Sequence, residues 1–324
     1  MLRLTGALLL LSAMVAHAQQ PIPIIFDTDI GSDIDDALAL GLALQSPELD
    51  IRAVTTVSDD TVGRGRLAWK ELGLYGRHDI PLATGAPETL MGPAPTERVP
   101  PQFQVLTDQD TLPPAARRRA ADLIVDTLLD SPRKLTLVPV GPLTNIALAL
   151  KMEPRIKEKI ERIVLMGGAF SLLRPEYNIR RDAIASSIVF SSGVPITAVG
   201  LDVTLRCKLE GADLERLRAA RNDASRLLVR LIELWQSGQQ PGVYPTLHDP
   251  LAMAVVFRAG LVETQLGRVE VETAGTVGNG LTLFTPAERL PRNATASTLI
   301  ARQVNVRGFL DLLIERLSAP PRGR

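Results

Sequence analysis

The sequence is poor in cysteine, histidine and aromatic residues, and its charges balance. A single cysteine, Cys207, among 324 residues excludes an intrachain disulfide, so an exported fold would have to be stable on its core alone. The 36 basic and 36 acidic residues give a formal net charge of zero. We find no basic stripe of the kind that nucleic-acid binding requires, and the short run Arg117-Arg118-Arg119 is typical of a solvated helix face. We therefore expect no nucleic-acid partner.

The first eighteen residues have the pattern of a secretory signal peptide. Arg3 precedes an apolar run around Leu8-Leu9-Leu10-Leu11, and Ala16-His17-Ala18 has the small residues of a cleavage site. The run is too short to span a bilayer, and no other stretch is long and apolar enough to do so. We therefore expect cleavage after Ala18, export to the periplasm or the medium, and a mature protein outside the membrane.

One stretch near the start of the mature chain carries five carboxylates within ten positions. It follows Ile24-Ile25-Phe26, which predicts the end of a buried strand, and ligands of α/β proteins bind at the carboxyl ends of strands. Repulsion among so many carboxylates is costly unless a cation compensates it, and oxygen ligands suit Ca²⁺ or Mg²⁺ better than zinc. An acidic helix start would need only one or two aspartates. The stretch therefore predicts a metal or catalytic site made from Asp27, Asp29, Asp33, Asp35 and Asp36.

Strand and helix patterns alternate along the rest of the chain. The expected strands are 51–57, 79–83, 134–140, 160–166, 195–201, 268–272 and 298–306. The expected helices are 37–44, 64–74, 115–129, 146–150, 182–190, 209–235 with a break near Arg221, 251–257 and 309–317. Such alternation predicts a mainly parallel sheet with right-handed crossovers. We expect a signal peptide at 1–18 and one α/β domain at 19–324. The proline-rich stretch 86–114 predicts a long loop.

Later motifs place polar residues after expected strands, and each has an ordinary structural explanation as well. Gly141-Pro142 is typical of a strand-to-helix turn. His248-Asp249 stands before Pro250 and an apolar helix, which is also the signature of a helix N-terminus. His78 precedes a strand and is expected in a surface loop, so His248 is the imidazole expected at the site. Tyr244 and Trp235 are each equally compatible with stacking on a ligand and with packing in the core or in a loop.

Taken together, the motifs resemble the nucleoside hydrolase family, the inosine/uridine-preferring nucleoside N-ribohydrolases. The family's opening Asp-x-Asp-x-Gly-x-Asp-Asp is matched by residues 27–36, with two extra residues before the final pair. The resemblance runs from residue 24 to about 317 and implies the family's Rossmann-like single-domain fold, a mainly parallel sheet flanked by helices. Three further matches follow in the family's order: Val138-Pro139-Val140-Gly141-Pro142-Leu143-Thr144-Asn145, Leu165-Met166-Gly167-Gly168 with Glu176-Tyr177-Asn178, and His248-Asp249-Pro250-Leu251-Ala252.

The resemblance implies Ca²⁺-dependent hydrolysis of the N-glycosidic bond of ribonucleosides, giving free base and ribose. It implies that Asp29, Asp36 and Asp249 hold Ca²⁺ through carboxylates and that Val140 does so through its backbone carbonyl. Asp29 is also expected to take a proton from the attacking water, and His248 to protonate the departing base. The chemistry agrees, because the sugar becomes positively charged as the bond breaks and surrounding carboxylates stabilise that charge.

The resemblance also implies a set of sugar ligands and an assembly. Asp35, Glu176 and Asn178 are expected to bind ribose hydroxyls. Asp60 stands in a loop where many relatives have Gly-Asn, and we expect it to replace that Asn on the sugar. A second Asn of relatives has no counterpart in the short segment 169–175. Because the family usually forms dimers or tetramers, we expect a homodimer or homotetramer.

Two other functions compete with this interpretation. In a phosphohydrolase of the haloacid-dehalogenase type, Asp27 and Asp29 would be nucleophile and acid over Mg²⁺. That family has Thr or Val where Gly31 stands here, and release of phosphate from an ester would support it. A non-catalytic periplasmic nucleoside-binding protein would be favoured by loss of His248 or of a metal-binding Asp, and neither is lost. Tight nucleoside binding without release of base would support it.

Overall fold

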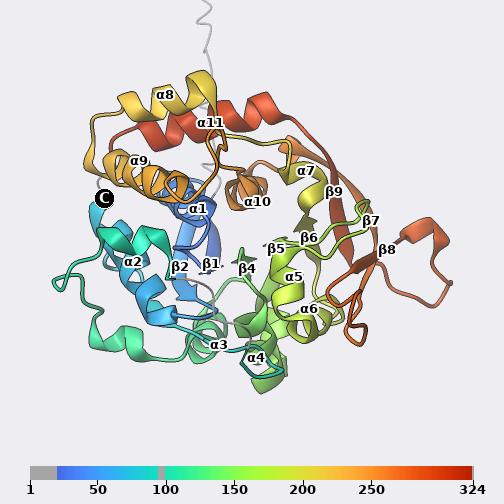
Figure 1. The fold of residues 1–324 in the computed structure, drawn as a ribbon. Helices are drawn as coiled ribbons and strands as arrows, with labels where there is room; N and C mark the ends of the chain where they lie inside the picture. Colours follow the sequence, from blue (N-terminus) through green and yellow to red (C-terminus); the bar gives the residue numbers. More distant parts are fainter. Residues whose placement is uncertain (1–19, 94–98, 323–324) are drawn as a thin grey trace, which may run out of the picture.

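A nine-stranded sheet forms the centre of the molecule in the computed structural model, which describes residues 20–93 and 99–322 (Figure 1). The expected signal peptide, residues 1–18, lies outside the described residues. Along the sheet the strands follow the order β3-β2-β1-β4-β5-β6-β9-β7-β8. The strands are β1 (Ile22–Thr28), β2 (Leu49–Thr56), β3 (Leu82–Thr84), β4 (Leu135–Pro139), β5 (Ile160–Met166), β6 (Ile196–Val199), β7 (Val262–Val271), β8 (Thr282–Pro286) and β9 (Thr298–Val304).

Most of the sheet is parallel, and one end of it is antiparallel. Each neighbouring pair from β3 to β9 runs parallel, whereas β7 pairs antiparallel with both β9 and β8. Parallel neighbours require crossover connections, and the helices that supply them cover both faces of the sheet. The predicted fold class, a single α/β domain with a mainly parallel sheet flanked by helices, is therefore confirmed.

The helices divide into two groups, each packed on its own hydrophobic core. In Figure 1, α1, α8, α9, α10 and α11 gather at the top and α3, α4 and α6 at the bottom. The helices are α1 (Asp35–Leu44), α2 (Thr61–Leu74), α3 (Ala120–Asp130), α4 (Thr144–Met152), α5 (Tyr177–Arg181), α6 (Ala183–Phe190), α7 (Leu201–Thr204), α8 (Gly211–Ala219), α9 (Asp223–Gln236), α10 (His248–Phe257) and α11 (Val306–Ser318).

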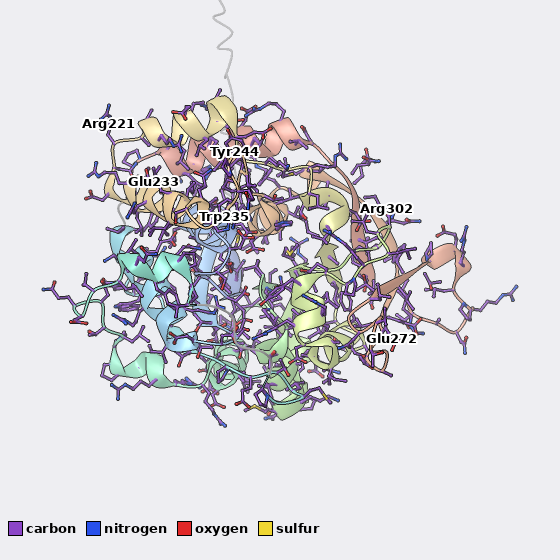
Figure 2. All side chains as sticks on the ribbon, in the orientation of Figure 1. Arg221, Glu233, Trp235, Tyr244, Glu272 and Arg302 are labelled. Atoms are coloured by element: carbon purple, nitrogen blue, oxygen red, sulfur yellow. The ribbon has the colours of Figure 1, made fainter. Side chains whose placement is uncertain are left out.

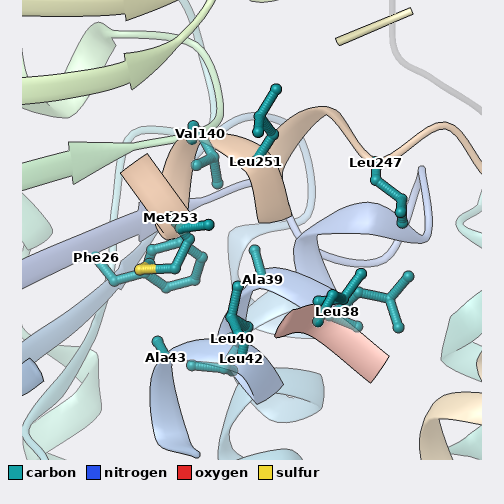
Figure 3. Close-up of a cluster of buried hydrophobic side chains, with 14 of the residues drawn as sticks. Phe26, Leu38, Ala39, Leu40, Leu42, Ala43, Val140, Leu247, Leu251 and Met253 are labelled. Carbon is teal, nitrogen blue, oxygen red and sulfur yellow. The ribbon is translucent and has the colours of Figure 1, made fainter. Parts of the chain in front are cut away.

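Helix α1 is the most enclosed of the helices around the site. All ten of its residues are buried, and it packs against α10, α11 and the sheet. Figure 3 shows Leu38 and Leu42 of α1 in the same cluster as Phe26 of β1 and Leu251 of α10. Fully burying one such side chain contributes about 1.5–3 kcal/mol, so this packing fixes where α1 and α10 begin. The functional consequence is that both N-termini are held in place.

Several expected boundaries were wrong. The antiparallel strand β8 was not expected at all. The helix expected at 182–190 is preceded by a separate short helix, α5, and the strand expected at 195–201 ends earlier, so that Asp202 lies in α7. The break expected near Arg221 is confirmed, because α8 and α9 are separate. In the described part of 86–114, the expected long loop is confirmed; it contains a short 3₁₀ turn, Pro101–Val105.

No helix among the described residues has the length and apolar character needed to cross a membrane.

Candidate active site

A cavity of about 560 Å³ opens beyond the carboxyl ends of β1, β4, β5 and β6. Its volume lies within the roughly 300–1,000 Å³ of small-molecule sites, and its position is where α/β sheets bind ligands. The structure brings eight of the nine predicted site residues to its wall. They are Asp29, Asp35, Asp36, Val140, Glu176, Asn178, His248 and Asp249.

Three buried carboxylates form the floor of the cavity. Asp35 and Asp36 start α1, and Asp249 lies in the first turn of α10. Each offers an oxygen within 4.8 Å of the others, and each is at most 4% exposed. The backbone N–H of Asp249 donates to Asp35 Oδ2 at 3.1 Å, and the Thr28 hydroxyl donates to Asp36 Oδ1 at 2.5 Å. The floor is therefore built where two packed helices begin.

Ionisation of the floor carboxylates is unfavourable because they are buried close to one another. Burial, and then repulsion by neighbouring aspartates, raises the pKa of Asp35, Asp36 and Asp249 well above the usual range. The positive ends of two helix dipoles offset part of this repulsion. A hard cation would offset more, so these three residues could hold a metal ion. Asp35, expected on the sugar, belongs to this tight group, whereas Asp29 lines the cavity beside it.

Arg64 of α2 holds the acidic loop, residues 29–34, in place, and no sequence pattern had indicated this role. Its side chain is fully buried, and its guanidinium donates to the backbone carbonyls of Asp29 and, at 3.1 Å, of Ile30. Its Nε donates to the Ser58 carbonyl at 2.8 Å. The loop itself turns at Gly31, whose φ of +120° favours glycine and where a Cβ would lie 2.6 Å from a Phe103 ring carbon.

Asp59, in the loop after β2, links the acidic loop to α5. Arg181 of α5 donates to Asp59 Oδ1 at 2.6 Å, and Arg64 lies 3.9 Å from Asp59 Oδ2. Ser58 and Asp59 have φ of 68° and 54°, a conformation that most residues avoid and that packing must maintain. The two arginines therefore tie the loop after β2 to both the acidic loop and the helix that carries Asn178.

Glu176 and Asn178 form a polar wall above the floor. Glu176 caps α5, and its carboxylate accepts from the backbone N–H groups of Asn178, Ile179 and Gly168 at 2.8–3.1 Å. Asn178 Nδ2 donates to the Val140 carbonyl at 2.6 Å. A carbonyl oxygen has two lone pairs and a carboxylate about four acceptor positions, so Val140 and Glu176 both keep capacity for a ligand.

His248 faces the cavity at the start of α10. Its Nδ1 lies 2.7 Å from the Thr204 hydroxyl, which holds the ring in place. Burial, and secondarily the charge of Arg174, lowers the pKa of His248 to about 4. At neutral pH the ring is therefore uncharged, and its second nitrogen can donate a hydrogen bond when Nδ1 accepts from Thr204.

The two aromatic candidates for base stacking behave differently. Trp235, at the end of α9, is 8% exposed and lines the cavity. Tyr244 is 38% exposed and is not among the residues of the cavity wall. In Figure 2, Trp235 lies nearer the centre of the molecule than Tyr244.

Two aspartates of the sequence motifs do not reach the cavity. Asp60 is exposed and caps α2, accepting from the Gly63 N–H at 2.8 Å, so its expected sugar contact has no support in the geometry. Asp27 is fully buried and accepts from Thr55 at 2.5 Å and from Asn145 at 2.8 Å. Burial, chiefly, raises the pKa of Asp27 to about 7. Because Asp27 is fully buried and does not line the cavity, it is not placed to be the nucleophile that a haloacid-dehalogenase mechanism needs.

Comparisons with known proteins agree with this site. Residues 24–311 match the family model for inosine-uridine preferring nucleoside hydrolases. The chain belongs to this family of ribonucleoside hydrolases. It is 36% identical over 327 residues to the pyrimidine-specific ribonucleoside hydrolase RihA of Citrobacter koseri, an alignment covering 92% of this chain and 98% of that protein.

Solved structures of nucleoside hydrolases share the family's fold with this chain. A plant nucleoside hydrolase, PpNRh1, superposes with a TM-score of 0.81 at 29% identity and covers 93% of this chain and 100% of its own. A purine-preferring ribonucleoside hydrolase from Gardnerella vaginalis superposes with a TM-score of 0.79 at 30% identity, covering 91% and 98%. These similar proteins are named for different bases, so family membership leaves the base open.

Proposed function

We propose that this chain hydrolyses the N-glycosidic bond of ribonucleosides in a Ca²⁺-dependent reaction that releases free base and ribose. The observation that carries the proposal is the floor of Asp35, Asp36 and Asp249 at the bottom of a cavity large enough for a nucleoside. Carboxylates so placed stabilise the positive charge that develops on the sugar as the bond breaks.

The donor set fits a hard cation. Three carboxylates supply only oxygen ligands within 4.8 Å of one another, and Asp29 and the Val140 carbonyl line the same cavity. All-oxygen sites of this kind suit Ca²⁺, which takes six to eight oxygens in variable geometry. When bound, Ca²⁺ would supply positive charge that makes a nearby water easier to deprotonate.

The chain's own residues divide the remaining tasks. Asp29 accepts a proton from the attacking water. Glu176 and Asn178, on the wall, and Asp35, on the floor, accept or donate hydrogen bonds to ribose hydroxyls. His248 approaches the base from the start of α10 and donates a hydrogen bond to it as it departs.

The test is incubation of the purified protein with a panel of purine and pyrimidine nucleosides, with free ribose measured. We expect ribose release that is lost on exhaustive chelation and restored by added Ca²⁺, and about one Ca²⁺ per active site by elemental analysis. Full activity after chelation would remove the metal from the mechanism. Release of phosphate from simple esters, or tight nucleoside binding without ribose, would replace the proposal by one of the two competing functions.

We also propose that the protein is exported and that its mature chain begins near Gln19. The apolar run and Ala16-His17-Ala18 support this. Mass spectrometry of protein from its native source should show residues 1–18 removed; retention of them would contradict export. The homodimer or homotetramer stays a prediction that light scattering can check.

A further inference from the structure

The charges around the cavity are distributed unevenly. Among the described residues, two cationic side chains line it, Arg174 and Arg180. Arg174 lies close enough to His248 for its charge to act on that ring. Arg174 therefore lines the cavity on the side of His248, the residue expected at the departing base. The lining carboxylates are Asp29, Asp33, Asp35, Asp36, Glu176 and Asp249.

The segment that carries Arg174 is short, exposed and fixed at both ends. The Asp202 carboxylate accepts from the backbone N–H groups of Phe170 and Ser171 at 2.8 and 2.7 Å. At the other end, Glu176 Oε2 accepts from Gly168 N–H at 3.1 Å. Arg174 follows Ser171 by three residues and precedes Glu176 by two, so the loop that carries it is anchored on both sides.

Breaking an N-glycosidic bond separates charge in opposite directions. The sugar becomes positive above the carboxylate floor, and the electron pair of the bond goes to the base. A group that stabilises the transition state on the base side must therefore be positive or donate hydrogen bonds. An arginine keeps its charge at every pH that proteins tolerate, and its planar guanidinium can donate two hydrogen bonds side by side.

We propose, on the basis of the hydrolase function above, that Arg174 binds the departing base and stabilises it as an anion. The C1′–N bond breaks and its electron pair stays on the base nitrogen. Water adds its oxygen to C1′ and gives one proton to Asp29. The base takes a proton from solvent after release, and Asp29 returns its proton to solvent, so that one water is consumed. In this arrangement His248 donates a hydrogen bond to the base, next to the permanently charged guanidinium of Arg174.

The test compares leaving groups in Arg174→Gln. The substrates are uridine, 5-fluorouridine and p-nitrophenyl riboside, whose leaving groups need progressively less stabilisation as anions. We expect kcat for uridine to fall roughly 10²-fold, as for loss of one preorganised electrostatic donor, with smaller losses along the series. Arg174→Lys keeps the charge and should recover part of the uridine activity. Activity on p-nitrophenyl riboside also shows that the variant is folded.

Arg206→Gln is the matched control. Arg206 is exposed, follows the lining residue Leu205 and donates to Gln303 outside the cavity wall, so its loss removes an equal charge without touching the base side. It should leave all three substrates unchanged.

The outcomes separate this inference from the function on which it rests. Equal losses on all three substrates, or no loss on uridine, would overturn the role of Arg174 while the hydrolase function stands. If the unaltered protein released ribose from no nucleoside, the function itself would be wrong. A second readout is binding of barbituric acid, an acidic pyrimidine that is anionic at neutral pH, measured by calorimetry. It should bind more tightly than uracil to the unaltered protein, and Arg174→Gln should lose that preference.

Discussion

The cavity floor and the interior beneath α1 both bury carboxylates, and they differ in access. On the floor, Asp35, Asp36 and Asp249 face a cavity. Beneath α1, Glu71 is 1% exposed, and its carboxylate has no hydrogen-bond partner within residues 20–93 and 99–322. The backbone of Gly41 closes over it, because a Cβ there would lie 3.3 Å from Glu71 Oε1.

Burial raises the pKa of the floor aspartates and of Glu71. The two places differ in how the cost of a buried negative charge can be offset. For Glu71 burial is the main cause and the charge of Asp36 the next. A sealed carboxyl can avoid the cost of a buried charge only by keeping its proton. An open cluster can instead take up a cation that arrives with solvent or substrate. The floor is therefore identified as the functional site because its carboxylates face the cavity, and not because their pKa values are raised.

The largest expected effect comes from removing a floor carboxylate. Asp249→Ala should lose bound metal and lower kcat/KM by roughly 10³-fold or more, since it removes both a ligand and charge opposite the developing sugar cation. Elemental analysis and the ribose assay measure the two losses. Unchanged metal content together with unchanged turnover would show that the floor carboxylates, like the sealed Glu71, have no role in metal binding or catalysis.

His248→Ala tests the assistance given to the leaving base at the start of α10. Uridine hydrolysis should slow by roughly two to four orders of magnitude, about 3–5 kcal/mol of barrier, because assistance to the leaving base is lost. Metal content should be unchanged, and hydrolysis of p-nitrophenyl riboside should fall far less. Equal losses on both substrates would show that the ring positions the sugar or supports the fold.

Glu71→Gln tests the sealed carboxyl through pH. The raised pKa means that folded Glu71 keeps a proton that the unfolded chain has lost above its ordinary value near 4.5. The unfolding free energy therefore falls as pH rises from that value through the folded pKa, by at most about 1.4 kcal/mol per pH unit. The variant lacks this dependence. Urea unfolding at pH 5 to 8 should show that the unfolding free energy of Glu71→Gln, relative to that of the unaltered protein, increases with pH. If the two unfolding free energies changed in parallel with pH, Glu71 would not be a sealed, protonated carboxyl.

The smallest effect is expected at Asp60, which lies near the site without reaching it. Asp60→Ala should cost about 1 kcal/mol of stability through loss of the α2 cap and leave kcat/KM unchanged. Asp60→Asn, which can still cap the helix, should be neutral in both urea unfolding and the ribose assay. A raised KM in both variants would restore the sugar contact expected from the sequence.

Much of the site could be predicted from local pattern. The apolar run before Asp27 and the alternation of strands and helices are properties of neighbouring residues, and they indicated a mainly parallel sheet with its site at the strand ends. The motifs named Asp29, Asp36, His248 and Asp249, and all four line the cavity. Strand β8 was missed because a five-residue strand at the edge of the sheet carries little hydrophobic signal of its own.

By itself, the sequence determined which side chains were available for chemistry and roughly where along the sheet they fall. Only the tertiary structure decided which of them face the cavity. Asp27 lies in β1 and Asp29 follows the end of that strand, yet Asp27 is sealed against Thr55 and Asn145 whereas Asp29 lines the site. Arg64, distant in sequence, holds the acidic loop through backbone carbonyls. The physical reason is that burial and access depend on what packs against a residue, and those partners come from other elements of the chain.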